Sequence, residues 1–205
     1  MLTKTNVQIH LPGSILLDAG SETTGFSVDA CGTGSFTGLS YTIPAHASGK
    51  LVAAIQVMAL TSGDMKDLNE MVMTMLKASE QKKVIDYGKA QGSGNLSIWR
   101  FFSAGAQASA SKTTDTMTTS GLNPEQMTTI INRMFDMASK MSRVKLDFTI
   151  DNSKNDYNVS GDLQLYTISG TISTSKGTKQ FRMLADQGTA GGGSAPAKGE
   201  VISLS

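Results

Sequence analysis

The sequence predicts an α+β protein in which two amphipathic helices, at about residues 64–82 and 124–142, cover a largely antiparallel β-sheet or sheets. Apolar residues alternate with polar ones over several short stretches before residue 62 and after residue 143, which is typical of strands with one buried face. In the two stretches between them, apolar residues recur every three or four positions, as they do on one face of a helix. We expect residues 1–205 to form a single domain.

The composition sets limits on the class of protein. A chain of 205 residues can bury a core without disulfides or metals, and its lone cysteine, Cys31, excludes an intramolecular disulfide. The net charge of +1 provides no general field for phosphates, so we expect no nucleic-acid partner. The N-terminus lacks the pattern of a signal peptide and no stretch is as apolar as a spanning helix. We therefore expect a cytoplasmic protein, with signal-peptide-independent secretion as the alternative.

The first sixty residues have the pattern of strands. Apolar residues alternate at 7–11 and at 26–28, and residues 36–43 form a further extended piece that stops at a proline. Residues 51–60 are nearly all apolar, which is typical of a fully buried strand or of a short helix. We favour the strand, because glycines at both sides limit the run to strand length.

The period then changes to that of a helix at about 64–82. Asp64 is the expected N-cap and Gly88 the expected stop. Residues 95–102 return to a strand pattern and contain the most aromatic cluster of the chain.

Residues 103–121 carry small and hydroxyl side chains with almost nothing large to bury, so we expect a flexible loop or linker there. The clearest helix start follows, with Asn123 as the cap and Pro124 at the first helical position. An apolar stripe then runs through the helix predicted at 124–142.

The C-terminal part has the pattern of strands separated by turns. Residues 144–150 alternate regularly, and the turn residues that follow predict a hairpin with the next strand. The apolar phase changes near Leu165, which indicates a bulge or a bend. Further predicted elements are a strand through Thr174, a short strand at 181–184, a flexible Gly/Ala-rich connector at 188–199 and a final strand at 201–204.

The residues that carry catalytic chemistry are scarce. Of the two histidines, His10 is expected to be exposed, and His46 lies in a loop of small residues. Cys31 is the best candidate for a reactive thiol because glycines follow it, although a lone cysteine is more often a small buried hydrophobe. An enzyme using Cys31 with His46 is our least favoured hypothesis. The glycine pattern at 32–38 is not followed by a phosphate-binding helix, and one cysteine with two histidines cannot form a zinc site, so we expect no cofactor and no metal.

Two groups of residues are candidates for binding, with ordinary core packing as the alternative. The chain has twelve methionines, of which Met71, Met73 and Met137 lie off the apolar stripes of the helices. The second group is the aromatic cluster, because large aromatic side chains dominate interface energetics. Its members are Trp99, Phe101 and Phe102.

We therefore expect a non-enzymatic protein that acts through its surface, by assembling with itself or by binding a protein partner. The alternative is a membrane-acting, toxin-like protein. Its basis is the alternation of small and hydroxyl residues at 103–121, which resembles the refoldable Ser/Thr-rich hairpin of β-barrel pore-forming toxins. That resemblance implies that 103–121 would insert into a membrane after oligomerisation.

Overall fold

A computed structural model describes residues 24–91, 94–191 and 197–204, with backbone only at 33–39 and beyond residue 186. The strand expected at 7–11, together with His10, lies outside the described residues. In chain order the elements are β1 (Gly25–Ile43), β2 (Ala47–Met58), α1 (Ser62–Met75), α2 (Ala78–Gln91), the 3₁₀ turn η1 (Gly94–Leu96), α3 (Ser97–Phe102), α4 (Ala110–Thr119), α5 (Pro124–Met137), β3 (Met141–Asn152), β4 (Val159–Thr174), β5 (Gly177–Gly191) and β6 (Ala197–Leu204).

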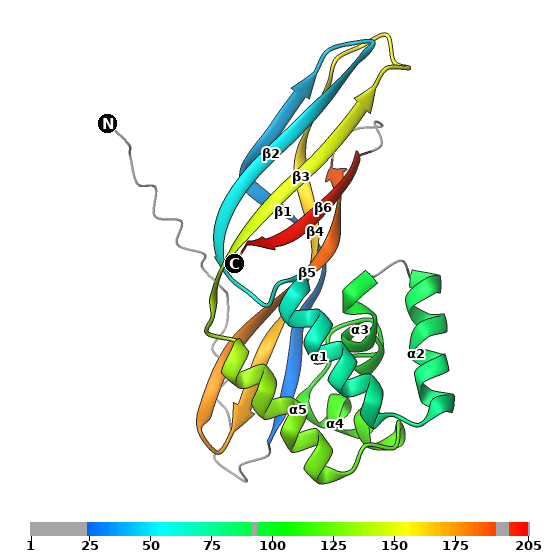
Figure 1. Cartoon of the computed structure of the whole chain (residues 1–205), viewed down its shortest axis with the longest axis vertical. Helices are drawn as coiled ribbons and strands as arrows, with labels where there is room; N and C mark the ends of the chain where they lie inside the picture. The colour runs from blue at the N-terminus through cyan, green and yellow to red at the C-terminus, as the bar shows by residue number, and fades with distance from the viewer. Residues whose placement is uncertain (1–23, 92–93, 192–196, 205) are drawn as a thin grey trace.

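The strands form a six-stranded sheet in the order β1-β4-β5-β6-β3-β2, and all the ladders between neighbours are antiparallel. The predicted α+β class with an antiparallel sheet is therefore confirmed. Figure 1 shows a long arm of strands at one end of the molecule, while the five α-helices gather beside the other end of the sheet. β1 and β2 are the two edge strands of the described sheet.

The arm has its own apolar core. Val144, Leu146 and Phe148 of β3 are fully buried and cluster with Leu163 and Leu165 of β4. Although a short turn joins β3 to β4, β3 pairs with β2 and β6, whereas β4 pairs with β1 and β5. The predicted hairpin of these two strands is therefore wrong: they share a core instead of a ladder, because burying both apolar faces against each other excludes more surface from water.

The larger core lies between the helices and the end of the sheet beside them (Figure 1). Phe26 of β1 contacts Trp99 of α3 and Phe181 of β5 edge-on, with ring centroids 5.9 and 6.2 Å apart. Residues on α1 and α5, including Leu68 and Ile130, complete this core. The helices are thus held to the sheet by one continuous apolar cluster.

The helix expected at 64–82 is divided into α1 and α2. The chain is extended at Leu76, with ψ of 147°. The side-chain amide of Gln81 donates to the carbonyl oxygens of Met73 and Leu76 at 2.8 and 3.0 Å, which satisfies groups left free by the break. The N-cap is Thr61, and Asp64 is its capping-box partner rather than the cap itself. Gly88 lies inside α2 and does not stop it.

The second predicted helix starts as expected. Asn123 caps α5, its side chain accepts from the backbone N–H of Gln126 at 2.8 Å, and Pro124 occupies the first turn. The α-helix ends at Met137 rather than near 142, because β3 already begins at Met141 and pairs with β2 from its first residue.

Residues 95–102 are helical, so the predicted strand is wrong. Ile98, Trp99 and Phe102 all face the core, a spacing that suits one side of a helical turn.

The structure also differs from the expectation of a flexible segment at 103–121. Residues 110–119 form α4, and Thr113 and Met117 are buried against the sheet end.

The C-terminal strands are longer than predicted. β5 spans Gly177–Gly191 instead of 181–184, and the proposed connector at 188–199 is largely strand, since 188–191 belong to β5 and 197–199 to β6. Residues 192–196 lie outside the described part of the chain. The bulge near Leu165 is confirmed by a register shift between Leu165 and Thr167 in the β4–β5 ladder.

Candidate interaction surface

The feature that stands out on the surface is the free edge of β2. β2 pairs with β3 in one unbroken register from Ala47 opposite Asn152 to Met58 opposite Met141. On its other side, β2 has no partner strand among the described residues. Natural edge strands are usually protected by charges, prolines or bulges. β2 has a single charged residue, Lys50, no proline and no bulge, so its edge is an open template for another strand.

The inner side of this edge is apolar and incompletely covered. Leu51, Ala53, Ile55 and Val57 pack against the core of the arm but are only half-buried. The β3 residues beside them are fully buried. β2 is therefore not the fully buried strand that the sequence indicated, because it lies at the margin of the sheet.

The outer side of β2 and β3 also exposes apolar side chains. Val52 is 54% exposed, Met58 55% and Met141 60%. Met58 and Met141 are directly opposite each other in the ladder, so the two flexible thioethers form one patch.

Beside Val52, Asp147 pairs with Lys50 and Lys145, each at 3.1 Å. The hydrogen bonds from Lys50 and then Lys145 lower the pKa of the Asp147 carboxyl.

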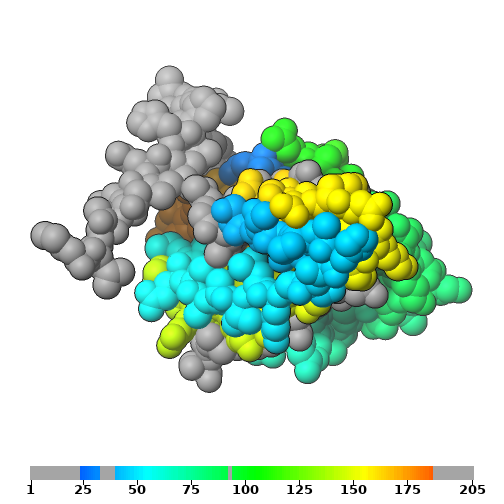
Figure 2. Space-filling view, turned by 90° about the horizontal axis from the view of Figure 1, so that it is seen from above, coloured from blue at the N-terminus to red at the C-terminus, as the bar shows by residue number. Residues whose placement is uncertain are grey.

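At the tip of the arm the two connecting turns lie side by side, as the blue and yellow surfaces in Figure 2 show. The backbone N–H of His46 donates to the carbonyl of Asn155 at 3.2 Å. His46 itself has a left-handed backbone, φ 55°, and its imidazole lies 3.0 Å from Asp156 in an exposed pair. The tip is thus a polar cap on the apolar core of the arm.

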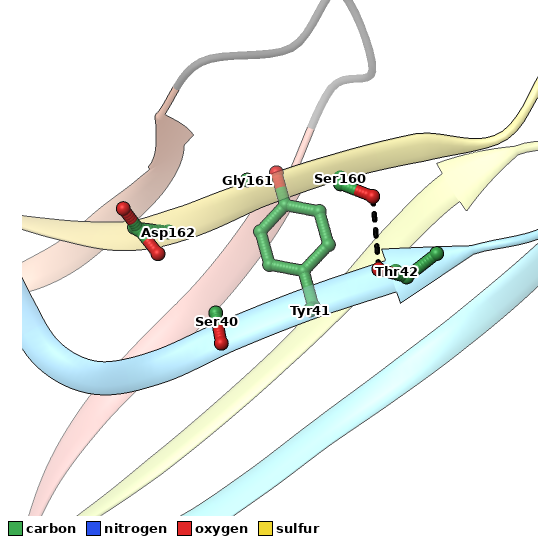
Figure 3. Close-up of a pocket in the computed structure, with 6 residues that line it drawn as sticks. All are labelled: Ser40, Tyr41, Thr42, Ser160, Gly161 and Asp162. Atoms are coloured by element: carbon green, nitrogen blue, oxygen red, sulfur yellow. Dashed lines mark hydrogen bonds between the residues drawn. The ribbon is translucent and has the colours of Figure 1, made fainter.

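A shallow hollow lies just below this tip, between β1 and β4 (Figure 3). The ring of Tyr41 extends between the two strands, and Thr42 and Ser160 share a hydrogen bond of 2.8 Å. The hydroxyl of Tyr41 is buried without a hydrogen-bond partner. Burial and the nearby Asp162 raise the pKa of Tyr41. The hollow is open and is lined by hydroxyl side chains and by the carboxylate of Asp162.

The structure places the Cys31 thiol beside Tyr166, with Sγ 3.0 Å from the phenol oxygen. The guanidinium of Arg100 lies 4.8 Å from the centre of the Tyr166 ring. Burial, followed by the hydrogen bond with Cys31, raises the pKa of Tyr166 to about 12. His46 is not part of this group: on β1, Cys31 is opposite Ile168, whereas the strand ends near His46 with Ile43 opposite Val159. The two partner residues are nine positions apart on β4, which is roughly 30 Å of strand, so the proposed Cys31–His46 pair is not assembled.

The binding candidates from the sequence are mostly in the core. Trp99 and Phe102 are fully buried, and Phe101 is half-buried against Tyr87. Met137 is buried, and Met71 and Met73 are half-buried against the helical core. These side chains are therefore not exposed as an interface in this structure. Sequence reasoning missed the β2 edge, although the uncharged stretch at 51–60 was the signal that marks it.

A second hollow, of about 460 Å³, lies where α1 meets η1. Asn69 accepts from the Trp99 indole N–H at 2.8 Å and donates to the carbonyl of Asn95 at 2.6 Å. Asn95 in turn donates to the carbonyl of Leu184 and accepts from the backbone N–H of Asp186, both at 3.0 Å. These bonds fasten η1 to β5, so Asn69 and Asn95 have a structural role here.

No family model, curated protein or solved structure matches this chain. Within the described ranges, no three His, Cys, Asp or Glu side chains are grouped as metal ligands. None of the helices among those residues combines the length and hydrophobicity that crossing a bilayer requires.

Proposed function

We propose that this is a non-enzymatic protein that assembles with itself, or binds a partner protein, through the open edge of β2. The observation that carries the proposal is a twelve-residue edge strand with one charge, no bulge and half-exposed apolar side chains along its inner row. Adding a strand to such an edge satisfies its free backbone groups and covers its apolar residues at the same time.

The exposed apolar residues next to the edge support the same proposal. Val52, Met58 and Met141 lie on the outer face of the β2–β3 ladder, where a docked strand or its side chains would contact them. Methionine side chains adapt to irregular surfaces, which suits an interface. The separation of Cys31 from His46 removes the pair on which an enzymatic hypothesis depended.

The proposal is tested by placing a charge on the edge. Val52→Lys puts an ammonium on an exposed position of β2, where folding is little affected but a docked strand would be repelled or forced to bury the charge. We expect assembly, measured by sedimentation velocity and native mass spectrometry from micromolar to millimolar concentration, to weaken by at least about tenfold, or 1.4 kcal/mol.

Ile85→Lys is the matched control. Ile85 is 46% exposed on α2, far from the arm, so the same charge there should leave assembly unchanged. A protein that remains monomeric at all concentrations and binds no other chain would refute the proposal. Loss of assembly in Ile85→Lys, with Val52→Lys unaffected, would move the interface to the helices.

A further inference from the structure

We propose that the strand that occupies the β2 edge is β2 of a second copy, paired antiparallel about a twofold axis at Ala53. This inference rests on the proposed function and names its partner. The two arms then form one continuous sheet across the dimer.

The choice of β2 over the other edge strand follows from regularity. β1 has register shifts between Val28 and Ala30 and between Ser35 and Ser40, and its Val28 also pairs with Ala108 of the helical part. Irregular strands of this kind resist edge-to-edge pairing. β2 has no shift over its whole length, and no described residue outside the sheet bridges to it, so it is the edge that a second chain can follow.

Symmetry then restricts the register. A twofold axis perpendicular to the sheet places a residue opposite its own copy and keeps inner faces aligned with inner faces. An axis at Ala53 pairs nearly the full strand, from Ser48 to Met58. It also sets Leu51 of one copy opposite Ile55 of the other, so the larger half-exposed residues of the inner row cover each other.

The charge pattern is compatible with this register. Lys50, the single charged residue of β2, falls opposite Gln56 of the second copy, and no like charges meet. On the outer face, Val52 falls opposite Ala54, which brings the exposed valine next to an apolar neighbour. The pairing therefore adds backbone hydrogen bonds and buries apolar surface without burying a lone charge.

Disulfide cross-linking tests both the partner and the register. In a Cys31→Ser background, Ala53→Cys places two thiols opposite each other, at the Cα separation of about 4.5–5.5 Å that suits a disulfide. We expect most of this variant to form a covalent dimer under mild oxidation. Ser48→Cys is the control, because the two copies of residue 48 lie about 33 Å apart in this register.

The outcomes separate this inference from the proposed function. If the wild type assembles and Val52→Lys does not, but Ala53→Cys fails to cross-link, the β2–β2 pairing about Ala53 is wrong and edge docking stands. If Ser48→Cys cross-links instead, the axis at Ala53 is wrong and the two copies pair in another register. If the wild type never self-associates, the pairing is wrong whatever partner the edge binds. Amide exchange provides a second measurement: the alternate amides of residues 51–57 that point away from β3 should exchange at least about tenfold more slowly in the wild-type dimer than in the Val52→Lys monomer.

Discussion

The side-chain amide nitrogen of Asn152 lies 2.8 Å from the carbonyl oxygen of Pro44, to which it donates a hydrogen bond. The same nitrogen lies within hydrogen-bond distance of the carbonyls of Ile43 and Tyr157. Asn152 is fully buried at the end of β3. A single side chain therefore ties the turn between β1 and β2 to the turn between β3 and β4.

Asn152→Ala should destabilise the arm. The substitution removes a fully buried side chain and leaves partly buried carbonyls without a donor, so we expect a loss of about 1–3 kcal/mol in the free energy of unfolding, measured by urea denaturation. Asn158→Ala is the control at the same tip: Asn158 is exposed and accepts one bond, from the backbone N–H of Ala45 at 3.1 Å. Equal losses for the two variants would contradict a special role for Asn152.

Gly170 of β4 should not tolerate a side chain. A Cβ at this position would lie 1.9 Å from the carbonyl oxygen of Ser27 on β1, which is backbone and cannot move aside without disturbing the ladder. We expect Gly170→Ala to cost about 1–3 kcal/mol of stability in thermal or urea unfolding. Gly32→Ala on the facing strand is the control, because a Cβ there meets no atom of the described residues within 4 Å. If Gly170→Ala is as stable as Gly32→Ala, the close approach of β1 and β4 is wrong.

Asp64 should stabilise the protein in a pH-dependent way. Burial raises its pKa, but the hydrogen bonds from Lys140 and Thr61 outweigh burial and lower the pKa below its ordinary value. Its stabilisation is therefore present above the unfolded pKa and is lost as the pH falls through the lower, folded pKa. We expect Asp64→Asn to cost about 1 kcal/mol at neutral pH and almost nothing near pH 2, measured by urea unfolding.

Asp136→Asn is the comparison for Asp64. Asp136 pairs with Lys176 at 3.4 Å, and both side chains are more than half exposed, so this substitution should change stability little at either pH. A constant effect of Asp64→Asn across the pH range would show that its carboxylate charge does not matter.

The membrane-acting alternative requires α4 to leave its place. The Thr113 hydroxyl donates to the carbonyl of Phe26, and Met117 is fully buried. Thr113→Val removes that bond and should cost about 1–3 kcal/mol. We expect no dye release from neutral or anionic liposomes between about pH 5 and 8 for wild type or variant. Leakage that increases in Thr113→Val would instead favour insertion of 103–121.

Local signals predicted part of this fold well. The start of α5 follows from Asn123 and Pro124, and the strand β3 follows from strict alternation, because both are set by neighbouring residues. The predictions of a strand at 95–102 and of a flexible segment at 110–119 are wrong because neighbouring residues do not determine the structure of these stretches. Their helical state depends on contacts with distant strands, such as the bond from Thr113 to Phe26, and tertiary packing overrides weak propensity.

The candidate interaction surface was harder to predict than the elements that form it. The sequence predicts a strand near β2. Whether a strand is central or at an edge, however, depends on the order of strands in the sheet, and β2 pairs with β3 although all the α-helices lie between them in the sequence. Trp99 and Phe102 illustrate the same limit, since aromatic residues suit cores and interfaces equally well and only the fold distinguishes them.

The pairing of β1 with β4 and of β2 with β3 also determines when the arm can form. Phe26 faces Ile172, and Met58 faces Met141, so each ladder joins segments more than eighty residues apart in the chain. Such nonlocal contacts make folding slow, because the chain loses the entropy of closing a long loop before strand pairing can stabilise it. During synthesis β2 leaves the ribosome well before β3, and until then the uncharged stretch at 51–58 has both of its sides unpaired. Newly made chains should therefore be most prone to aggregate at the strand for which we propose a role in assembly.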